Sequence, residues 1–205
     1  MPSSSHKRVP FGDNVFNVWE NVYEPAEDSF LFAENLNVHE GDEVLDMGAG
    51  CGILGIVAAK KVNKVVAVDV NPHAIRCAKE NAALNDVRSK MGFVQGDLFT
   101  PLSEKAKFDV ILFNAPYLPT DDAEGDSWLE RAWNGGAKGR QIIDRFITEA
   151  PKHLKQTGRV LLMQSTLSGV DETVYKFAVQ GMSARVVASR ALPFFETITL
   201  IDAKT

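Results

Sequence analysis

One stretch of the chain decides the fold: Val44-Leu45-Asp46-Met47-Gly48-Ala49-Gly50-Cys51-Gly52-Ile53-Leu54-Gly55. An apolar run, a turn of closely spaced glycines and a second apolar run predict a buried strand, a tight loop and a helix. Glycine lets the backbone approach a ligand closely, and open α/β sheets bind ligands at the carboxyl ends of their strands. The stretch therefore predicts the ligand-binding strand, loop and helix of an α/β protein.

The rest of the chain continues this alternation. Apolar runs predict seven strands, over Glu43–Met47, Lys64–Val70, Gly92–Gln95, Phe108–Phe113, Gly158–Gln164, Ala184–Ala188 and Glu196–Ile201. Helical spacing predicts helices over Glu27–Leu36, Ile53–Lys61, Asn71–Leu84, Gly139–Leu154 and Val170–Val179. This order favours a mostly parallel sheet between two layers of helices. The last two runs are too close for a helical crossover and should form a C-terminal antiparallel hairpin.

Length and composition are those of one globular domain. The chain has 205 residues, 45% hydrophobic and 24% charged, which excludes a disordered or collagen-like chain. We expect a single domain over residues 1–205, with about residues 1–20 as an N-terminal extension. There is no membrane-length apolar run, no apolar core of a signal peptide and no disulfide framework. These features predict a cytoplasmic protein with no membrane partner.

The charge pattern argues against direct nucleic-acid binding. The chain carries 22 basic and 27 acidic residues, a net charge of −5, and lacks the basic stripe typical of duplex-binding proteins. Five acids lie within ten residues: Asp121, Asp122, Glu124, Asp126 and Glu130. They are typical of a solvated loop, or of a surface that meets a basic partner. The four histidines show no metal-ligand spacing, so we expect no metal site.

The acid before the glycines selects the ligand class. Gly50, Gly52 and Gly55 match the G-x-G-x-x-G pattern of dinucleotide sites, a weak signal on its own. Asp46, at the strand end, would repel a bound pyrophosphate, whereas a carboxylate suits a cationic ligand. S-adenosylmethionine carries an ammonium and a sulfonium group and no phosphate, and is therefore the expected cofactor.

Two more acids follow the next strands. Asp69 lies 21 residues after Gly48, close to the offset at which an acid meets ribose hydroxyls, and Asp97 follows the third strand. Each acid alone also fits a helix cap or a turn. Together with the loop, the three acids resemble the class I S-adenosylmethionine-dependent methyltransferases. That resemblance implies a three-layer Rossmann-like fold with a seven-stranded, mostly parallel sheet and a C-terminal antiparallel hairpin.

The fourth predicted strand runs into Asn114-Ala115-Pro116-Tyr117. An amide or exocyclic amino nitrogen is a poor nucleophile. An enzyme that methylates it must therefore position the nitrogen with acceptors that take a hydrogen bond from each of its two N–H groups. Asn114 offers its side-chain carbonyl and Ala115 its backbone carbonyl, while Pro116 stiffens the turn and Tyr117 offers a ring face. We therefore predict that Asn114, Pro116 and Tyr117 are catalytic and that all four residues bind the substrate. The motif resembles the N-P-P-Y of amino-group methyltransferases, with alanine in place of the first proline.

Further segments narrow the resemblance to one family. The run Val22-Tyr23-Glu24-Pro25-Ala26-Glu27-Asp28-Ser29 and the later Trp133-Asn134-Gly135-Gly136 resemble the archaeal and eukaryotic branch of the HemK-like protein-glutamine methyltransferases. That resemblance implies methylation of the glutamine in the Gly-Gly-Gln motif of class 1 release factors. It also implies a small zinc-binding activator protein as partner. The implied cofactor contacts are Ser29, Asp46, Gly48, Ala49, Gly50, Asp69, Asp97, Leu98 and Asn114.

Two other functions remain open at this point. An adenine-N6 methyltransferase acting on RNA or DNA would use the same Asn-x-Pro-Tyr geometry. A non-catalytic subunit that binds the cofactor would fit the altered residue Ala115. The third strand, near Gly92–Gln95, should lie at a sheet edge, where exposed backbone groups and Phe93 and Val94 could receive the activator by strand addition.

Overall fold

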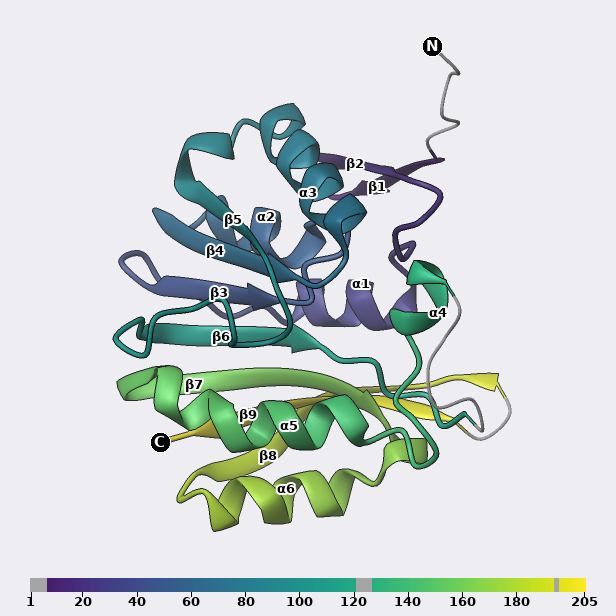
Figure 1. Ribbon diagram of the computed structural model, residues 1–205, viewed down its shortest axis with the longest axis vertical. Helices are drawn as coiled ribbons and strands as arrows, with labels where there is room; N and C mark the ends of the chain where they lie inside the picture. The colour runs from purple at the N-terminus through teal and green to yellow at the C-terminus, as the bar shows by residue number, and fades with distance from the viewer. Residues whose placement is uncertain (1–6, 121–126, 194–195) are drawn as a thin grey trace.

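The alternating apolar runs assemble into one seven-stranded sheet with the strand order β5-β4-β3-β6-β7-β9-β8, as the computed structural model shows (Figure 1). The structure describes residues 7–120, 127–193 and 196–205. The strands are β3 (Glu43–Met47), β4 (Lys64–Asp69), β5 (Met91–Gln95), β6 (Phe108–Asn114), β7 (Leu154–Ser165), β8 (Ser183–Ala191) and β9 (Thr197–Lys204). Four of the five acids of the predicted cluster, at residues 121–126, lie outside the described residues, and only Glu130 is described.

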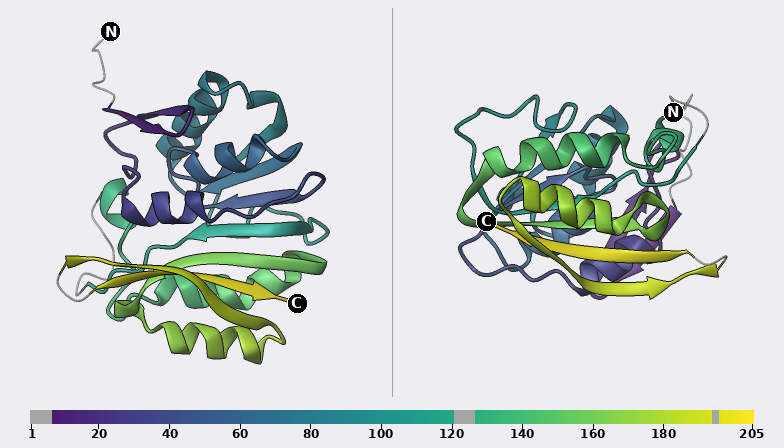
Figure 2. Two further views of the ribbon diagram at one scale, coloured as in Figure 1. Left: turned by 180° about the vertical axis from the view of Figure 1, so that it is seen from behind. Right: turned by 90° about the horizontal axis from the view of Figure 1, so that it is seen from below.

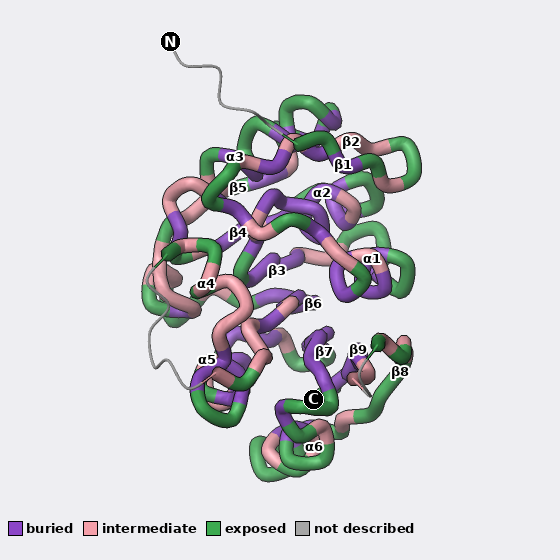
Figure 3. The backbone as a smooth tube through the Cα atoms, turned by 90° about the vertical axis from the view of Figure 1, so that its right-hand side faces the viewer, coloured by how far each residue is buried: buried purple, intermediate pink, exposed green. Residues whose placement is uncertain are grey.

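The pairing directions confirm the predicted sheet. Strands β5, β4, β3, β6 and β7 are parallel, whereas β9 runs antiparallel to both β7 and β8. The last two strands therefore form the predicted C-terminal hairpin. As Figure 3 shows, the central strands are buried while β8 is exposed at its edge. Because the parallel strands share one direction, β3, β4, β5 and β6 all end at the same edge of the sheet.

Two layers of helices cover the sheet (Figure 2). Helices α1 (Glu27–Glu34), α2 (Ile53–Ala59) and α3 (Pro72–Leu84) contribute to one apolar cluster. Helices α5 (Gln141–Glu149) and α6 (Val170–Val179) contribute to the other. Buried phenylalanines mark both layers, Phe32 in the first and Phe146 and Phe177 in the second. Burying apolar side chains on both faces of the sheet is the main source of stability in such a fold.

The N-terminal segment forms a hairpin where we had expected only an extension. Strands β1 (Lys7–Phe11) and β2 (Asn14–Val18) pair antiparallel to each other, separately from the main sheet. Two side chains of α3 bond the backbone of β2. Asn81 accepts from Asn17 N at 2.9 Å and donates to Asn17 O at 2.8 Å, and Asn85 bonds Val15 in the same way. The amides act as a neighbouring strand would, an interaction that the local sequence pattern does not reveal.

Two boundaries also differ from the predictions. The helix expected to reach Leu154 ends at Glu149 and is followed by a 3₁₀ turn over Ala150–His153. Pro151 has no backbone N–H to continue the α-helix, so the chain tightens and β7 begins early, at Leu154. A short helix, α4 (Trp128–Arg131), was not predicted and begins at a capping box of Ser127 and Glu130. Among the described residues, no helix has the length and apolar character needed to cross a membrane.

Candidate active site

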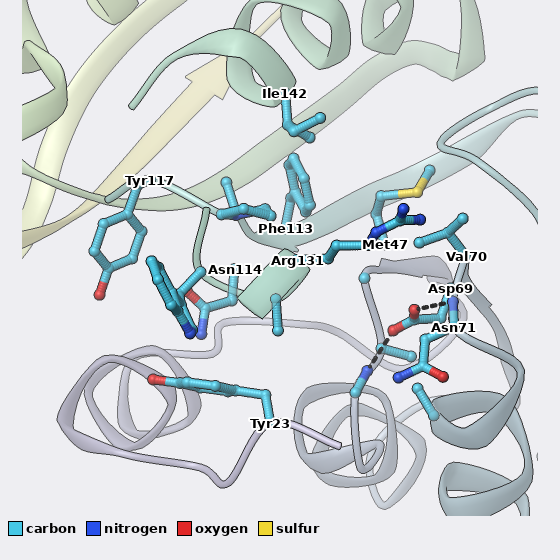
Figure 4. Close-up of a pocket in the computed structure, with 18 of the residues that line it drawn as sticks. Tyr23, Met47, Asp69, Val70, Asn71, Phe113, Asn114, Tyr117, Arg131 and Ile142 are labelled. Carbon is cyan, nitrogen blue, oxygen red and sulfur yellow. Dashed lines mark hydrogen bonds between the residues drawn. The ribbon is translucent and has the colours of Figure 1, made fainter. Parts of the chain in front are cut away.

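A cavity of about 710 Å³ opens at the carboxyl ends of β3, β4, β5 and β6. All but one of the predicted site residues line it: Ser29, Gly48, Ala49, Gly50, Asp69, Asp97, Leu98, Asn114, Ala115, Pro116 and Tyr117. The exception is Asp46. In Figure 4, Asp69 and Asn71 lie toward one end of the cavity, and Tyr23, Asn114 and Tyr117 lie toward the other. The topology thus brings residues from distant parts of the chain to one site.

The glycine loop bends through left-handed backbone conformations. Gly48 has φ +65°, Gly50 +55° and Gly52 +89°, values that side chains disfavour. A Cβ at Gly50 would meet no protein atom within 4 Å, so its backbone conformation, and not crowding, calls for glycine there. The bend brings Gly48, Ala49 and Gly50 to the cavity wall.

Asp69 fastens this loop to the end of β4. Its Oδ2 accepts from Gly50 N at 2.9 Å, and its Oδ1 accepts from Asn71 N at 2.8 Å (Figure 4). Burial raises the pKa of Asp69, and the bonds from Gly50, Asn71 and Val70 act in the opposite direction. Because each carboxylate oxygen has more than one lone pair, both oxygens can still accept from a ligand hydroxyl.

Asp46 lies behind the loop, not on the cavity wall as the sequence had suggested. Its side chain is buried, and its Oδ2 accepts from Gly55 N at 2.9 Å at the start of α2. Burial raises the pKa of Asp46 to about 7. A Cβ at Gly55 would lie 2.7 Å from that oxygen, so the pair needs a glycine. The carboxylate therefore joins β3 to α2 and supports the loop from below.

The third acid forms an ion pair at the cavity rim. Asp97 accepts from Arg145 of α5, and both residues line the cavity. The next residue, Leu98, has a positive φ of +47°, which is uncommon for a residue with a side chain. Such strained positions are concentrated at functional sites. Among the described residues, no group of three or more histidine, cysteine or acidic side chains could hold a metal ion.

Asn114 is held by α1 at the other end of the cavity. Its Nδ2 donates to Asp28 Oδ2 at 3.1 Å and to Ser29 Oγ at 3.3 Å. Its Oδ1 is buried and has no hydrogen-bond partner within the described structure. Buried polar atoms are rarely left unpaired. This free acceptor on a cavity-lining residue is what an incoming N–H group would need.

Asp28 and Tyr23 are site residues that the sequence reasoning did not single out. Asp28 is only 5% exposed and accepts from the hydroxyls of Tyr23, at 3.3 Å, and Tyr117, at 3.2 Å. Burial and the nearby Asp28 carboxylate raise the pKa of both tyrosines, so their hydroxyls remain protonated donors. The available signal was an acid on the first turn of a helix that is otherwise packed against the core.

Comparisons with known proteins identify the family of this chain. The family described as methyltransferase small domain matches residues 23–130. A Methanocaldococcus jannaschii protein, provisionally named protein N5-glutamine methyltransferase MJ0928, is 46% identical over 181 residues, covering 87% of this chain and 90% of its own. Human methyltransferase HEMK2 is 32% identical over 195 residues, and the match covers 89% of this chain and 90% of the human protein. The chain belongs to the HemK-like family of S-adenosylmethionine-dependent methyltransferases.

Solved structures agree with the fold of this HemK-like chain. A chain of the Encephalitozoon cuniculi Mtq2–Trm112 complex, described as responsible for methylation of the eRF1 translation termination factor, superposes with a TM-score of 0.68. That chain is 25% identical and is covered to 99%, with 90% of this chain covered. The Thermus thermophilus rRNA methyltransferase RsmC, solved with S-adenosylmethionine and guanosine, gives a TM-score of 0.73 at 20% identity. The superposition covers 98% of this chain and 50% of the RsmC chain. At this identity the similarity shows a common fold and nothing more.

As a member of this family, the enzyme uses S-adenosylmethionine as its cofactor. The residues present fit it, because acidic side chains on the cavity wall suit a cationic ligand and the cavity has the size of a typical small-molecule site. The glycine loop and Asp69 offer the bent backbone and the carboxylate predicted for an adenosyl group.

Proposed function

We propose that this enzyme methylates the side-chain amide nitrogen of the glutamine in the Gly-Gly-Gln motif of a class 1 peptide chain release factor. The observation that carries the proposal is the buried, unpartnered Oδ1 of Asn114, a residue that lines the same cavity as the glycine loop. A primary amide has two N–H donors, and Ala115 follows with a backbone carbonyl. The names of the M. jannaschii relative and of the E. cuniculi complex support the same acceptor and substrate.

In the proposed reaction, the protein positions a weak nucleophile. Asn114 Oδ1 and the Ala115 carbonyl accept hydrogen bonds from the two N–H groups of the glutamine amide. These two bonds turn the nitrogen toward the methyl donor. Pro116 restricts the turn, and the ring of Tyr117 packs against the planar amide. When bound, S-adenosylmethionine supplies an electrophilic methyl group. The amide proton that the methyl group replaces is released to solvent, and positioning and fixed dipoles account for the rate gain without a strong base.

We assign the cofactor contacts to the residues around the other end of the cavity. Asp69 would accept from the ribose hydroxyls, and Gly48, Ala49, Gly50, Asp97 and Leu98 would hold the rest of the cofactor. Ser29 and Asn114, at the acceptor end, would contact it on the side of the transferred methyl group. Asp46 acts only indirectly, because it supports the glycine loop from below.

The decisive experiment is transfer of labelled methyl from S-adenosylmethionine to a purified release factor, beside tRNA, rRNA and DNA. Label on the release factor that is lost when the Gly-Gly-Gln glutamine is changed to asparagine would support the proposal. Label on nucleic acid alone would favour an adenine-N6 methyltransferase. Cofactor binding with no transfer to any acceptor, in the presence of the activator, would favour a non-catalytic subunit. Either of the last two results overturns the proposal.

We further propose that a small zinc-binding activator protein binds the edge of β5, and that the complex works in the cytoplasm with the translation machinery. Strand β5 is the terminal strand of the sheet, and Phe93, covered by the Arg88 guanidinium 5.0 Å from its ring, and Val94 are only partly buried. The E. cuniculi neighbour was solved as a complex with Trm112, which supports a partner of this kind. An acidic enzyme also suits a basic, ribosome-binding substrate.

The two edges of the sheet provide a matched test of this interface. Gln95→Pro on β5 should reduce co-purification of the activator at least tenfold, because the Gly96 N–H bonds Asp69 O on β4 and the Gln95 N–H therefore faces the free edge. Val187→Pro, in the irregular part of β8 at the opposite edge, should leave it unchanged, since prolines are tolerated at bulges. The catalytic loop is untouched in both variants. Loss of the activator with Val187→Pro and its retention with Gln95→Pro would show that the interface is on β8.

A further inference from the structure

Helix α1 carries a buried carboxylate, Asp28, that is stabilised by hydrogen bonds and by no ion pair among the described residues. Asp28 accepts from five groups: the Ser29 backbone N–H and hydroxyl, the Asn114 amide, and the Tyr23 and Tyr117 hydroxyls. None of the ion pairs within the described residues involves Asp28, although it is only 5% exposed. Burying a charge without a cation is costly. An aspartate at this position therefore has an effect that a neutral residue would not have.

That effect is on the orientation of the Asn114 amide. The two ends of an asparagine side chain have nearly the same shape, so packing alone does not choose between them. A carboxylate can only accept, and Asp28 Oδ2 lies 3.1 Å from Nδ2. In the flipped orientation, Oδ1 would face the carboxylate and repel it. Ser29 Oγ, at 3.3 Å, favours the same orientation only through Asp28, because its single hydroxyl proton is donated to Asp28 Oδ1 and leaves Oγ as an acceptor.

We propose that Asp28 is a positioning residue that fixes the flip of Asn114, so that Oδ1 and not Nδ2 is presented to the acceptor N–H. The same carboxylate also holds the hydroxyl of Tyr117 at 3.2 Å. One side chain from α1 thereby sets both ends of the Asn114–Tyr117 turn, across 86 and 89 residues of sequence. This proposal rests on the role of Asn114 as an acceptor, but it does not depend on which macromolecule carries the acceptor nitrogen.

The test compares Asp28→Asn with Glu27→Gln, the same loss of charge one residue earlier on an exposed side chain. Asp28→Asn keeps the shape but can donate toward Asn114, so the amide is free to flip. We expect kcat to fall at least ~30-fold, with KM and the cofactor Kd changed less than threefold, and Glu27→Gln to match the wild type. Any acceptor that turns over can be used, so failure of the release-factor proposal stays distinct from failure of this one.

A reciprocal swap separates positioning from a structural role. In Asp28→Asn/Asn114→Asp, residue 28 donates and residue 114 has two oxygens, so one of them faces the acceptor whichever way it turns. We expect the swap to recover at least ~10-fold of the activity lost in Asp28→Asn. We also expect Asp28→Asn to have little further effect in an Asn114→Ala background. A swap worse than either single variant, or equal losses in both backgrounds, would overturn the proposal.

The wild-type protein provides a test that needs no turnover, even if Asp28→Asn does not fold. In ¹⁵N-edited NMR, one Asn114 side-chain proton should be shifted downfield by the carboxylate and protected from exchange with water. In folded Asp28→Asn, that proton should move toward the position of a free amide. Rapidly exchanging Asn114 protons at free-amide shifts in the wild type would show that the bond to Asp28 is absent, and the proposal would be wrong.

Discussion

The two ends of the cavity are built in different ways. At one end, the glycine loop and Asp69 present backbone groups whose conformation is fixed by hydrogen bonds to carboxylates. At the other end, Asn114 and Tyr117 are held by side-chain bonds to a helix more than eighty residues away. Figure 4 shows these ends separated across the cavity. The first end binds the cofactor in our proposal, and the second holds the acceptor.

The difference indicates how each end should respond to mutation. A ligand site made of backbone groups depends on turns that are stable before binding, so its variants should change affinity. A site made of oriented side chains depends on the direction of single polar atoms, so its variants should change the rate. We therefore predict that variants at the glycine-loop end of the cavity change mainly cofactor affinity, and that variants at the Asn114 end change mainly the rate of methyl transfer.

The largest expected effect concerns the support beneath the glycine loop. Asp46 has a pKa of about 7 in the folded protein, because of burial, against 3.8 in its unperturbed state. Between these values unfolding releases a proton, so rising pH favours the unfolded chain. The contribution is fully present below about pH 4 and is lost as pH rises toward 7. A pKa shift of about three units corresponds to about 4 kcal/mol in the free energy of unfolding.

The matched variant is Asp46→Asn, which keeps an acceptor for the Gly55 N–H and cannot ionise. Urea unfolding at pH 4.5, 6 and 8 should show the stability of the wild type falling relative to the variant across this range. Asp69, whose pKa burial also raises, is present in both proteins, but its repulsion of the Asp46 charge acts only in the wild type and in the same direction as burial. Parallel pH profiles would mean that Asp46 is ionised in the folded protein and that its environment is more polar than described.

The next effect tests the acceptor end. Asn114→Ala removes the unpartnered Oδ1 but leaves the sheet and the glycine loop in place. Single-turnover methyl transfer should fall by at least ~10²-fold, or about 2.7 kcal/mol, the scale for losing one preorganised polar group. Cofactor affinity from calorimetry should fall only modestly. A transfer rate close to the wild type would show that the turn Asn114–Tyr117 is not the catalytic site.

The same comparison explains what the sequence could and could not predict. The glycine loop, Asp69 and the turn at Asn114 each follow a strand directly, so the strand pattern was sufficient to bring them together at one edge. The bonds from Asp28 cross the fold, and no local pattern links residue 28 to residue 114. We predicted Asp46 on the cavity wall because it ends a strand. The strand pattern does not reveal that its carboxylate accepts from the Gly55 N–H behind the glycine loop. The β1–β2 hairpin was missed because its partner is a pair of asparagines on α3.

A smaller effect tests the cofactor end. Asp69→Asn can accept at one oxygen only, so its amide must face either the Gly50 or the Asn71 N–H as a second donor. Losing a hydrogen bond to a charged group costs roughly 1.5–3 kcal/mol, so cofactor Kd should rise about 10- to 100-fold. At saturating cofactor, kcat should fall less than tenfold. The reverse result, a normal Kd with a collapsed kcat, would contradict the proposed division between the two ends.

The smallest effect is expected at the residue where this chain departs from the N-P-P-Y motif. Ala115 is buried, and its N–H donates to Met163 O at 3.4 Å, a long and therefore weak bond. Ala115→Pro would remove that donor and crowd β7, while the carbonyl that we assign to the acceptor would remain. These effects oppose the gain in stiffness, so kcat should change less than about threefold and stability by about 1 kcal/mol or less. Single-turnover rates and urea unfolding of the variant measure both quantities. A drop as large as that of Asn114→Ala would show that the flexibility of this turn, and not only the direction of its acceptors, is part of the acceptor end.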